Sequence, residues 1–265
     1  MNDTGGARSP DGPSETVGRR ASVLTQIRLA AGFLTILPLV DSQGDAPEEV
    51  SASLGWFPLV GFGIGGALAG EDYLLGFLCG DAIRAALLVM TLAIVTGAVH
   101  LDGLADTADA LGAGRDRKRA LEILRDSRIG TFGASALFFV LALKLLAIAA
   151  TAGKLRYAAL WLAPGVARWA MVALACRLDY LRANGAGTTL LAHDSRRNFI
   201  LASSIAIAAA LPLAGYHSLR VSITAAAITF ALGALYRKWL GGLTGDLIGA
   251  AGEIVETAAL IAMSA

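Results

Sequence analysis

Three aspartates spaced like residues on one face of a helix are the most informative feature of this sequence. Asp102, Asp106 and Asp109 follow a long apolar segment that stops at His100–Leu101. Their i, i+4, i+7 spacing would project all three carboxylates from one helical face within two turns. Carboxylates so close repel one another, and a divalent cation removes that repulsion. Mg²⁺ is suited to such a site, because it binds carboxylates together with substrate phosphate oxygens.

Basic residues follow the aspartates and suit the binding of phosphates. They are Arg115, Arg117, Lys118, Arg119, Arg125 and Arg128. Acidic residues for a metal next to basic residues for anions favour phosphoryl-transfer chemistry. The alternative is a solvated, salt-bridged loop between two membrane helices, and the spacing alone does not decide between the two.

Composition predicts a polytopic membrane protein. The 265 residues are 55% hydrophobic and only 16% charged, against roughly 25% charged in soluble domains, and the mean hydropathy is +0.62. Cys79 and Cys176 lie in or beside apolar stretches without the spacing of a metal site or a disulfide framework. The net charge of +1 excludes little, because local charge matters more than the sum in a membrane protein.

Apolar runs of nearly the ~20 residues needed to cross a bilayer predict an all-α membrane helix bundle with about seven spans. We expect the spans at about 53–70, 82–101, 132–151, 157–177, 199–216, 220–236 and 247–264. Residues 1–22 have the composition of a disordered tail. Leu29–Val40 is too short to span and predicts a re-entrant or interfacial helix. Residues 23–265 would then form one membrane-embedded catalytic domain.

Loop charges orient these spans. The 71–81 loop has Glu71, Asp72 and Asp81 but no basic residue, whereas the 102–131 loop is strongly basic. The second loop should therefore face the cytoplasm, and alternation places the 178–198 and 237–246 connections on the same side. Lys154, Arg156 and Arg220 fall on the outer side and count against this assignment.

A second acidic group lies in the last apolar segment. Asp246, Glu253 and Glu256 are spaced i, i+7, i+10 and share a helical face. Ionisable groups at membrane depth usually mark a functional site, and we rank that interpretation above an intramembrane salt bridge that only fixes helix packing. Arg168 could pair with Glu253 or Glu256 or reach a pyrophosphate, and Lys144 is expected to extend to the membrane surface.

The histidines differ in what they indicate. His100 could orient a metal-bound carboxylate or water, although a capping role is equally consistent. His193 lies in a polar loop and could contact substrate. No histidine pair has zinc-ligand spacing, so a zinc site is not expected.

Several motifs together resemble the cobalamin synthase family, the adenosylcobinamide-GDP ribazoletransferases of the membrane. The matching pieces, in the family's order, are FLTILPL, FPLVGFGIGG, HLDGLADTADAL, LEILRDSRIGTFG and GGLTGDLIGAAGEIVE. The resemblance covers about residues 32–256, and HLDGLADTAD together with DSRIGT is its most specific part. It implies a transferase of late cobalamin biosynthesis that joins adenosylcobinamide-GDP to α-ribazole or its 5′-phosphate, releases GMP and requires Mg²⁺.

The resemblance also assigns roles to residues. Asp102, Asp106 and Asp109 would hold Mg²⁺ against the pyrophosphate, while Asp246 and Glu253 would complete the catalytic set as further ligands or as the base on a ribose hydroxyl. The remaining site residues would bind substrate, with Asp126 orienting an arginine. These are His100, Arg119, Arg125, Asp126, Arg128, Arg168, Arg182 and Glu256.

Two positions depart from the family pattern. Ile36 stands where the family commonly has an arginine, and the 178–187 stretch keeps Arg182 but lacks the usual acidic pair. The expected partners are the small-molecule substrates and the lipid bilayer, not nucleic acid. A homo-oligomer or an association with other enzymes of the pathway would be compatible with the sequence. The resemblance also implies the cytoplasmic membrane of a bacterium, with the active site on the cytoplasmic face.

Two competing functions are less well supported. A CDP-alcohol phosphotransferase would carry Arg at the place of Asp106 and a later Gly-x3-Asp-x3-Asp spacing, which is absent. A transporter could use Asp246, Glu253 and Glu256 as an ion pathway, but the densest acidic and basic loop lies on one membrane face and no inverted repeat is visible.

Overall fold

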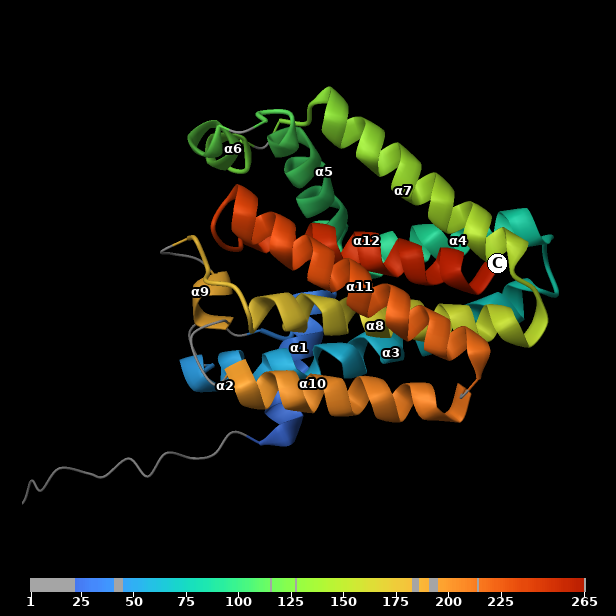
Figure 1. Cartoon of the computed structure of the whole chain (residues 1–265). Helices are drawn as coiled ribbons and strands as arrows, with labels where there is room; N and C mark the ends of the chain where they lie inside the picture. The colour runs from blue at the N-terminus through green and yellow to red at the C-terminus, as the bar shows by residue number, and fades with distance from the viewer. Residues whose placement is uncertain are drawn as a thin grey trace, which may run out of the picture.

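The described part of the chain is all helical. We describe it from a computed structural model for residues 22–40, 45–114, 116–126, 128–182, 186–190, 195–213 and 215–264, which contain no β-strand. In chain order the helices are α1 (Val23–Leu34), α2 (Pro47–Ser53), α3 (Phe57–Leu75), α4 (Asp81–Val95), α5 (Val99–Leu111), α6 (Arg117–Ile123), α7 (Thr131–Ala150), α8 (Gly153–Ala175), α9 (Ala186–Leu190), α10 (Ser195–Ala210), α11 (Tyr216–Trp239) and α12 (Gly245–Ser264), with short 3₁₀ turns at Leu54–Trp56 and Leu211–Leu213. The all-α prediction is confirmed (Figure 1).

Among the described residues, five helices are long and apolar enough to cross a membrane. They are the continuous run Pro47–Leu75, which ends in α3, together with α7, α8, α11 and α12. The predicted count of seven spans is not confirmed. The 199–216 prediction corresponds to α10, which has 16 residues and is about 24 Å long, short of the ~30 Å hydrocarbon core. The 82–101 prediction corresponds to α4 joined to part of α5, and this pair bends by 90°.

The bend lies at two residues with left-handed backbone conformation. Gly97 has φ 60° and Ala98 has φ 54°, a conformation that L residues other than glycine rarely adopt. The end of α4 is also held from outside, because the Ile36 N–H donates to the Val95 carbonyl at 2.9 Å. Beyond the bend, α5 has 13 residues and three aspartates, so we place it outside the spanning helices.

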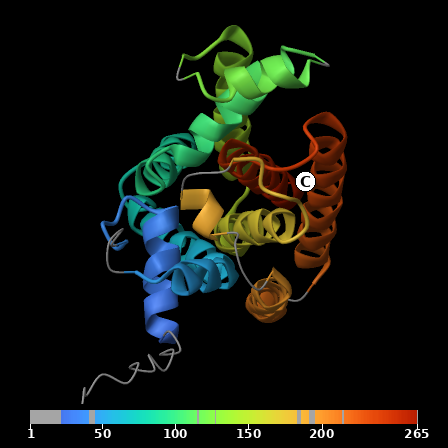
Figure 2. The same cartoon turned by 90° about the vertical axis from the view of Figure 1, so that its left-hand side faces the viewer.

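The N-terminal apolar helix has 12 residues and is too short to span a bilayer, as predicted. α1 begins earlier than expected, because Ser22 caps it through a hydrogen bond from the Leu24 N–H at 3.2 Å, and it ends at Leu34. Leu29 and Ala30 are fully buried, and α1 crosses the long helices at a steep angle in both views (Figures 1 and 2). Of the tail predicted for residues 1–22, all but Ser22 lies outside the described residues.

Glycines bring α3 into backbone contact with the central helix α8. A Cβ at Gly61 would lie 2.5 Å from the Pro164 carbonyl oxygen, and one at Gly65 would lie 2.5 Å from the Leu160 carbonyl oxygen. Pro164 has no N–H, so it leaves the Leu160 carbonyl without its helical donor. Gly61 and Gly65 of FPLVGFGIGG therefore serve close packing of membrane helices, as predicted.

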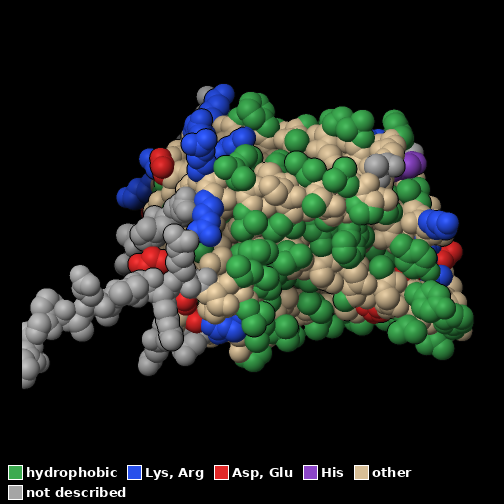
Figure 3. All heavy atoms as spheres, turned by 90° about the horizontal axis from the view of Figure 1, so that it is seen from below, with side chains coloured by type: hydrophobic (Ala, Val, Ile, Leu, Met, Phe, Trp, Pro, Cys, Tyr) green, Lys and Arg blue, Asp and Glu red, His purple; other side chains and the backbone are tan. Residues whose placement is uncertain are grey.

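The outer surface of the bundle suits lipid. Large apolar side chains are exposed along the outer helices, including Phe138 and Phe139 of α7 and Ile223 and Phe230 of α11. Figure 3 shows apolar side chains over the middle of one face and charged side chains toward its two ends. This distribution is expected for a protein surrounded by a bilayer.

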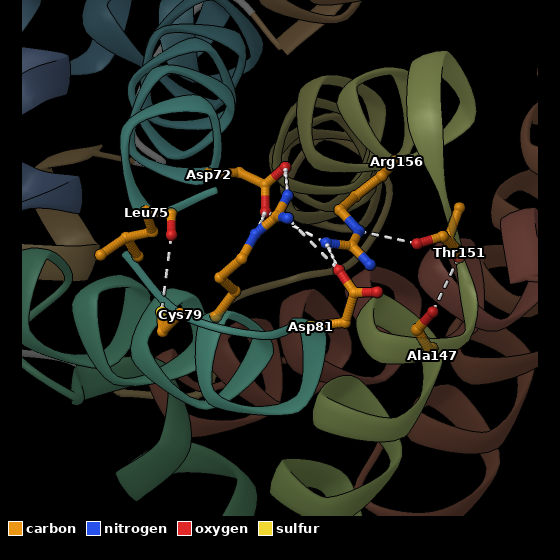
Figure 4. A network of polar contacts seen from close by, with 8 residues as sticks. Asp72, Leu75, Cys79, Asp81, Ala147, Thr151 and Arg156 are labelled. Atoms are coloured by element: carbon orange, nitrogen blue, oxygen red, sulfur yellow. Dashed lines mark hydrogen bonds and ion pairs between the residues drawn. The ribbon is translucent and has the colours of Figure 1, made fainter. Parts of the chain in front are cut away.

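A closed ion-pair network ties α3, α4 and α8 together at the 71–81 end (Figure 4). The buried Asp72 binds Arg84 through two hydrogen bonds of 3.0 and 2.7 Å, and Arg156 binds Asp81 at 2.8 Å and the Thr151 carbonyl at 2.6 Å. Arg156, which counted against the predicted orientation, is 2% exposed. Its charge is neutralised inside the fold, so it carries no weight in the charge-based orientation of loops.

The α3–α8 contact makes a testable prediction. Gly65→Ala should destabilise the protein by about 1–3 kcal/mol, since the added methyl meets backbone that cannot move aside. Gly63→Ala is the matched control, because a Cβ there meets nothing within 4 Å and improves helix propensity by up to ~1 kcal/mol. Thermal unfolding in detergent distinguishes the two variants, and equal melting temperatures would contradict the packing role of Gly65.

Candidate active site

The acidic motifs of α5 and α12, far apart in sequence, meet where the two helices cross. A Cβ at Gly103 would lie 2.8 Å from the Asp246 carbonyl oxygen, and one at Gly249 would lie 3.2 Å from the Cα of His100. One glycine on each helix thus permits close backbone approach. This crossing brings Asp246 close enough to Asp102 and Asp106 for their charges to interact.

Asp106 has a raised pKa, to which burial and its acidic neighbours both contribute. Partial burial raises the pKa of Asp106 to about 6, with further contributions from the charges of Asp102, Asp246 and Asp109, and Arg182 acts in the opposite direction. A carboxyl group with a pKa raised toward neutrality is suited to proton transfer. The neighbouring acids therefore add to the effect of burial in making ionisation of Asp106 less favourable.

Arg182 anchors this cluster. Its Nη2 donates to an Asp246 carboxylate oxygen at 2.6 Å and to the Leu124 carbonyl oxygen at 2.8 Å. The side chain therefore links the start of α12 to the end of α6. Arg182 was predicted to bind substrate, and in this structure it connects Asp246 of α12 to the end of α6.

Asp109 has a structural role that the sequence analysis missed. Its carboxylate oxygens accept hydrogen bonds from the Gly130 N–H at 2.7 Å and the Gly133 N–H at 2.9 Å, so Asp109 caps the N-terminus of α7. The signal in the sequence was indirect: α7 begins after Gly130, which has no side chain with which to cap the helix. The assignment of Asp109 as a metal ligand stays a prediction beside this observed role.

The predicted phosphate-binding arginines lie on the exposed α5–α7 connection. Arg119, Arg125 and Arg128 are solvent-exposed, and Arg115 lies outside the described residues. Asp126 contacts an arginine, as expected: Arg128 donates to both of its carboxylate oxygens, at 3.0 and 2.6 Å. These hydrogen bonds lower the pKa of Asp126 to about 2, so this exposed pair is ionised at all physiological pH values.

The deeper acids of α12 form a separate, buried network. Lys144 of α7 binds Glu253 at 2.7 Å and Glu256 at 2.5 Å, and Arg168 of α8 also binds Glu256. All four residues are 5% exposed or less. The expectation that Lys144 reaches the membrane surface was wrong, because both glutamates offer it a buried counter-charge. The pairing expected for Arg168 is present.

Glu253 and Glu256 therefore make the contacts of the packing role that the sequence analysis ranked second. Seven residues of helix, about 10 Å of rise, separate Asp246 from Glu253. His100, also buried, lies near this network and not at the exposed surface of the site. Their catalytic or substrate-binding roles stay predictions, and the predicted contact residue His193 lies outside the described residues.

No ready-made metal cage is present in the described part of the chain. Among those residues, no three His, Cys, Asp or Glu side chains are grouped as they would be around one ion. Mg²⁺ seldom uses such cages, since it is usually bound through one or two carboxylates together with substrate phosphates and water. Asp102, Asp106 and Asp246 with Arg182 carry a formal charge of −2, which suits an ion delivered with a phosphorylated substrate.

The fold and the site define a polytopic membrane protein with an acidic, arginine-flanked site where two of its helices cross. Residues 26–264 match the family described as cobalamin-5-phosphate synthase, and the chain belongs to that family of late cobalamin biosynthesis. The chain is similar to adenosylcobinamide-GDP ribazoletransferases of Roseiflexus sp. (40% identity, 89% of this chain and 87% of the relative) and Citrobacter koseri (40% identity, 87% and 96%). No solved structure matches the chain.

The cap of α7 leads to a prediction about stability. Asp109→Ala should lower stability by about 0.5–2 kcal/mol, because two N–H groups at the start of α7 lose their acceptor. Asp102→Ala, on the same face of α5, should lower it less, since Asp102 is exposed and, unlike Asp109, accepts no hydrogen bond from the start of another helix in the described part of the chain. Apparent melting temperatures in detergent compare the two, and an Asp109→Ala protein as stable as the wild type would contradict the capping role.

Proposed function

We propose that this protein joins adenosylcobinamide-GDP to α-ribazole or its 5′-phosphate, giving adenosylcobalamin or its 5′-phosphate and GMP. A ribose hydroxyl attacks the pyrophosphate, a new phosphate ester forms on the corrinoid side, and the P–O–P bond breaks with GMP as the leaving group. Family membership and the names of the relatives support this reaction. The observation in the fold that carries it is the meeting of Asp102 and Asp106 with Asp246 beside exposed arginines.

Each part of the site would have a role in such a transfer. Asp102 and Asp106 would hold Mg²⁺ against the pyrophosphate, and Asp109 would orient that face of α5 through its bonds to α7. Bound Mg²⁺ would neutralise the negative charge that develops on the phosphate oxygens. Arg119, Arg125 and Arg128 would bind the remaining phosphate oxygens from the exposed α5–α7 connection.

Asp246 is the best-placed candidate for the base that takes the proton of the ribose hydroxyl, because Asp102 and Asp106 would be bound to Mg²⁺. Arg182 would act as a positioning residue, since it fixes Asp246 by a 2.6 Å ion pair. Glu253 and Glu256 would contribute through the placement of α12, because their charges are already neutralised by Lys144 and Arg168.

The protein would lie in the cytoplasmic membrane of a bacterium with this site on the cytoplasmic face. The basic residues of α6, those at the start of α10 and those at the end of α11 support that orientation under the positive-inside rule. The ion pairs of Arg156 remove one of the three residues that opposed it.

Ion transport is less well supported than transferase activity. Glu253 and Glu256, the acids deepest in the bundle, are bound to cations in a buried network with no net charge. A proton or cation pathway would need acids accessible from water.

Turnover by the purified protein tests the reaction. The detergent-solubilised chain, given adenosylcobinamide-GDP and α-ribazole 5′-phosphate, should release GMP and a corrinoid product in equal amounts with Mg²⁺, and neither with EDTA. Chromatography follows both products. Folded protein that makes neither would refute the proposal.

The carboxylates can be tested one at a time. Asp102→Asn and Asp106→Asn should each reduce kcat by at least about 100-fold, because each loses a negative charge that would bind Mg²⁺ in the substrate complex. Glu48→Gln is the control, since Glu48 is an exposed acid of α2 with no part in the proposed site. Full activity in either asparagine variant would remove that residue from the site.

The raised pKa of Asp106 predicts how Mg²⁺ affects stability. The folded protein holds the Asp106 proton up to a pH of about 6, whereas an unfolded aspartate releases it near 4, so folding stability falls as the pH rises through 6. A cation that binds the ionised group offsets that loss. Mg²⁺ should therefore raise the melting temperature at pH 7.5 and have little effect at pH 5.

Asp106→Asn should remove most of this pH dependence of the Mg²⁺ effect, and Glu48→Gln should keep it. A Mg²⁺ shift of equal size at both pH values in the wild type would show that the ion binds elsewhere.

A further inference from the structure

A groove on the outer surface of the bundle runs between α8 and α11, which lie side by side (Figure 1). Its volume is about 250 Å³, and its walls include Ala173 and Leu174 of α8 and Phe230, Gly233 and Ala234 of α11. These side chains are apolar, and Gly233 and the alanines keep the space open. The hydroxyl of Thr229 already has a hydrogen-bond partner, because it donates to the Ala225 carbonyl oxygen at 2.6 Å.

Two arginines lie at one end of this groove. Arg177 follows the end of α8 with its guanidinium 5.0 Å from the centre of the Phe199 ring. Arg237, in the last turn of α11, donates to the carbonyl oxygen of Arg177 at 3.2 Å. Neither arginine takes part in an ion pair among the described residues. Their position at helix C-termini stabilises both cations but leaves their charges unbalanced.

Apolar walls and a cationic end match the two parts of an anionic phospholipid. From Arg237 to Thr229 is eight residues of helix, or about 12 Å, within one leaflet of a ~30 Å hydrocarbon core. Guanidinium groups bind phosphate through paired, charge-assisted hydrogen bonds. The groove also opens onto lipid, since Phe230 on its rim is 73% exposed.

We propose that this groove binds one anionic phospholipid, with an acyl chain along Gly233 and the headgroup phosphate at Arg177 and Arg237. An inorganic phosphate would use only the arginines, and a zwitterionic lipid would leave their charge partly unbalanced. An anionic phospholipid would contact the apolar walls with an acyl chain and balance the charge of both arginines with its headgroup. The proposal does not depend on the reaction catalysed, because none of the groove residues belongs to the acidic site.

Native mass spectrometry of the full chain in detergent can count bound lipids. The wild type, titrated with phosphatidylglycerol, should bind one molecule at least about tenfold more tightly than phosphatidylcholine with the same acyl chains. The double variant Arg177→Gln/Arg237→Gln should lose that preference. Gly233→Leu, which fills the groove and leaves both arginines, should weaken binding of both lipids.

Lys238→Gln is the matched control, because Lys238 is exposed on the same turn of α11 but does not line the groove. Because Lys238→Gln removes one charge, it is compared with the single variant Arg237→Gln. Of these two variants, only Arg237→Gln should weaken phosphatidylglycerol binding. Equal binding by these two variants would overturn the proposal, as would unchanged binding by Gly233→Leu. Displacement of the lipid by millimolar inorganic phosphate would reduce the groove to an anion site and also overturn it.

Discussion

The buried ion pairs between α12 and its two neighbours set the geometry on which the site depends. Lys144 and Arg168 approach Glu256 from α7 and α8, so α12 has one rotation in which its carboxylate is neutralised. In a low-dielectric interior, removing one partner of such a pair costs about 3–5 kcal/mol. Asp246 lies on the same face of α12 as these glutamates, and fixing the rotation of the helix deep in the bundle therefore also fixes the direction in which Asp246 points at its end.

The second constraint is the route of the chain into α5. A straight continuation of α4 would carry the aspartates onward along the axis of that helix. The left-handed residues Gly97 and Ala98 instead turn the chain by 90°, and Gly103 then lets α5 lie directly on the backbone of α12. The Asp109 carboxylate fastens the far end of α5 to α7. A polar helix that could not cross a bilayer is thus held rigidly against the spanning helices, which is what a precise catalytic arrangement requires.

Helical periodicity was sufficient to find the residues of the site but not their partners. Three aspartates on one face of α5 and three acids on one face of α12 follow from a 3.6-residue repeat, and the structure has both helices. The contact between the two faces depends on two glycines 146 positions apart in the chain, Gly103 and Gly249, which no local pattern pairs.

Hydropathy likewise located the apolar runs. Hydropathy could not predict the bend after α4, because the two small residues with left-handed backbone conformation are as apolar as the helix that precedes them. Lys144 was misjudged for a related reason: its counter-charges lie more than 100 residues away.

The two acidic groups of this protein differ in their charge balance, and that difference separates their roles. Lys144 and Arg168 against Glu253 and Glu256 sum to zero, and the group is buried. Asp102, Asp106 and Asp246 have only Arg182 among them and remain open to solvent at Asp102. A folded protein gains nothing in stability from an acidic cluster of this kind, since nearby like charges repel one another. A pyrophosphate substrate would add further negative charge to it. In the reaction proposed above, a divalent cation and the arginines of the α5–α7 connection would together offset that charge, so a cluster that is unfavourable in the free protein would become favourable in the substrate complex.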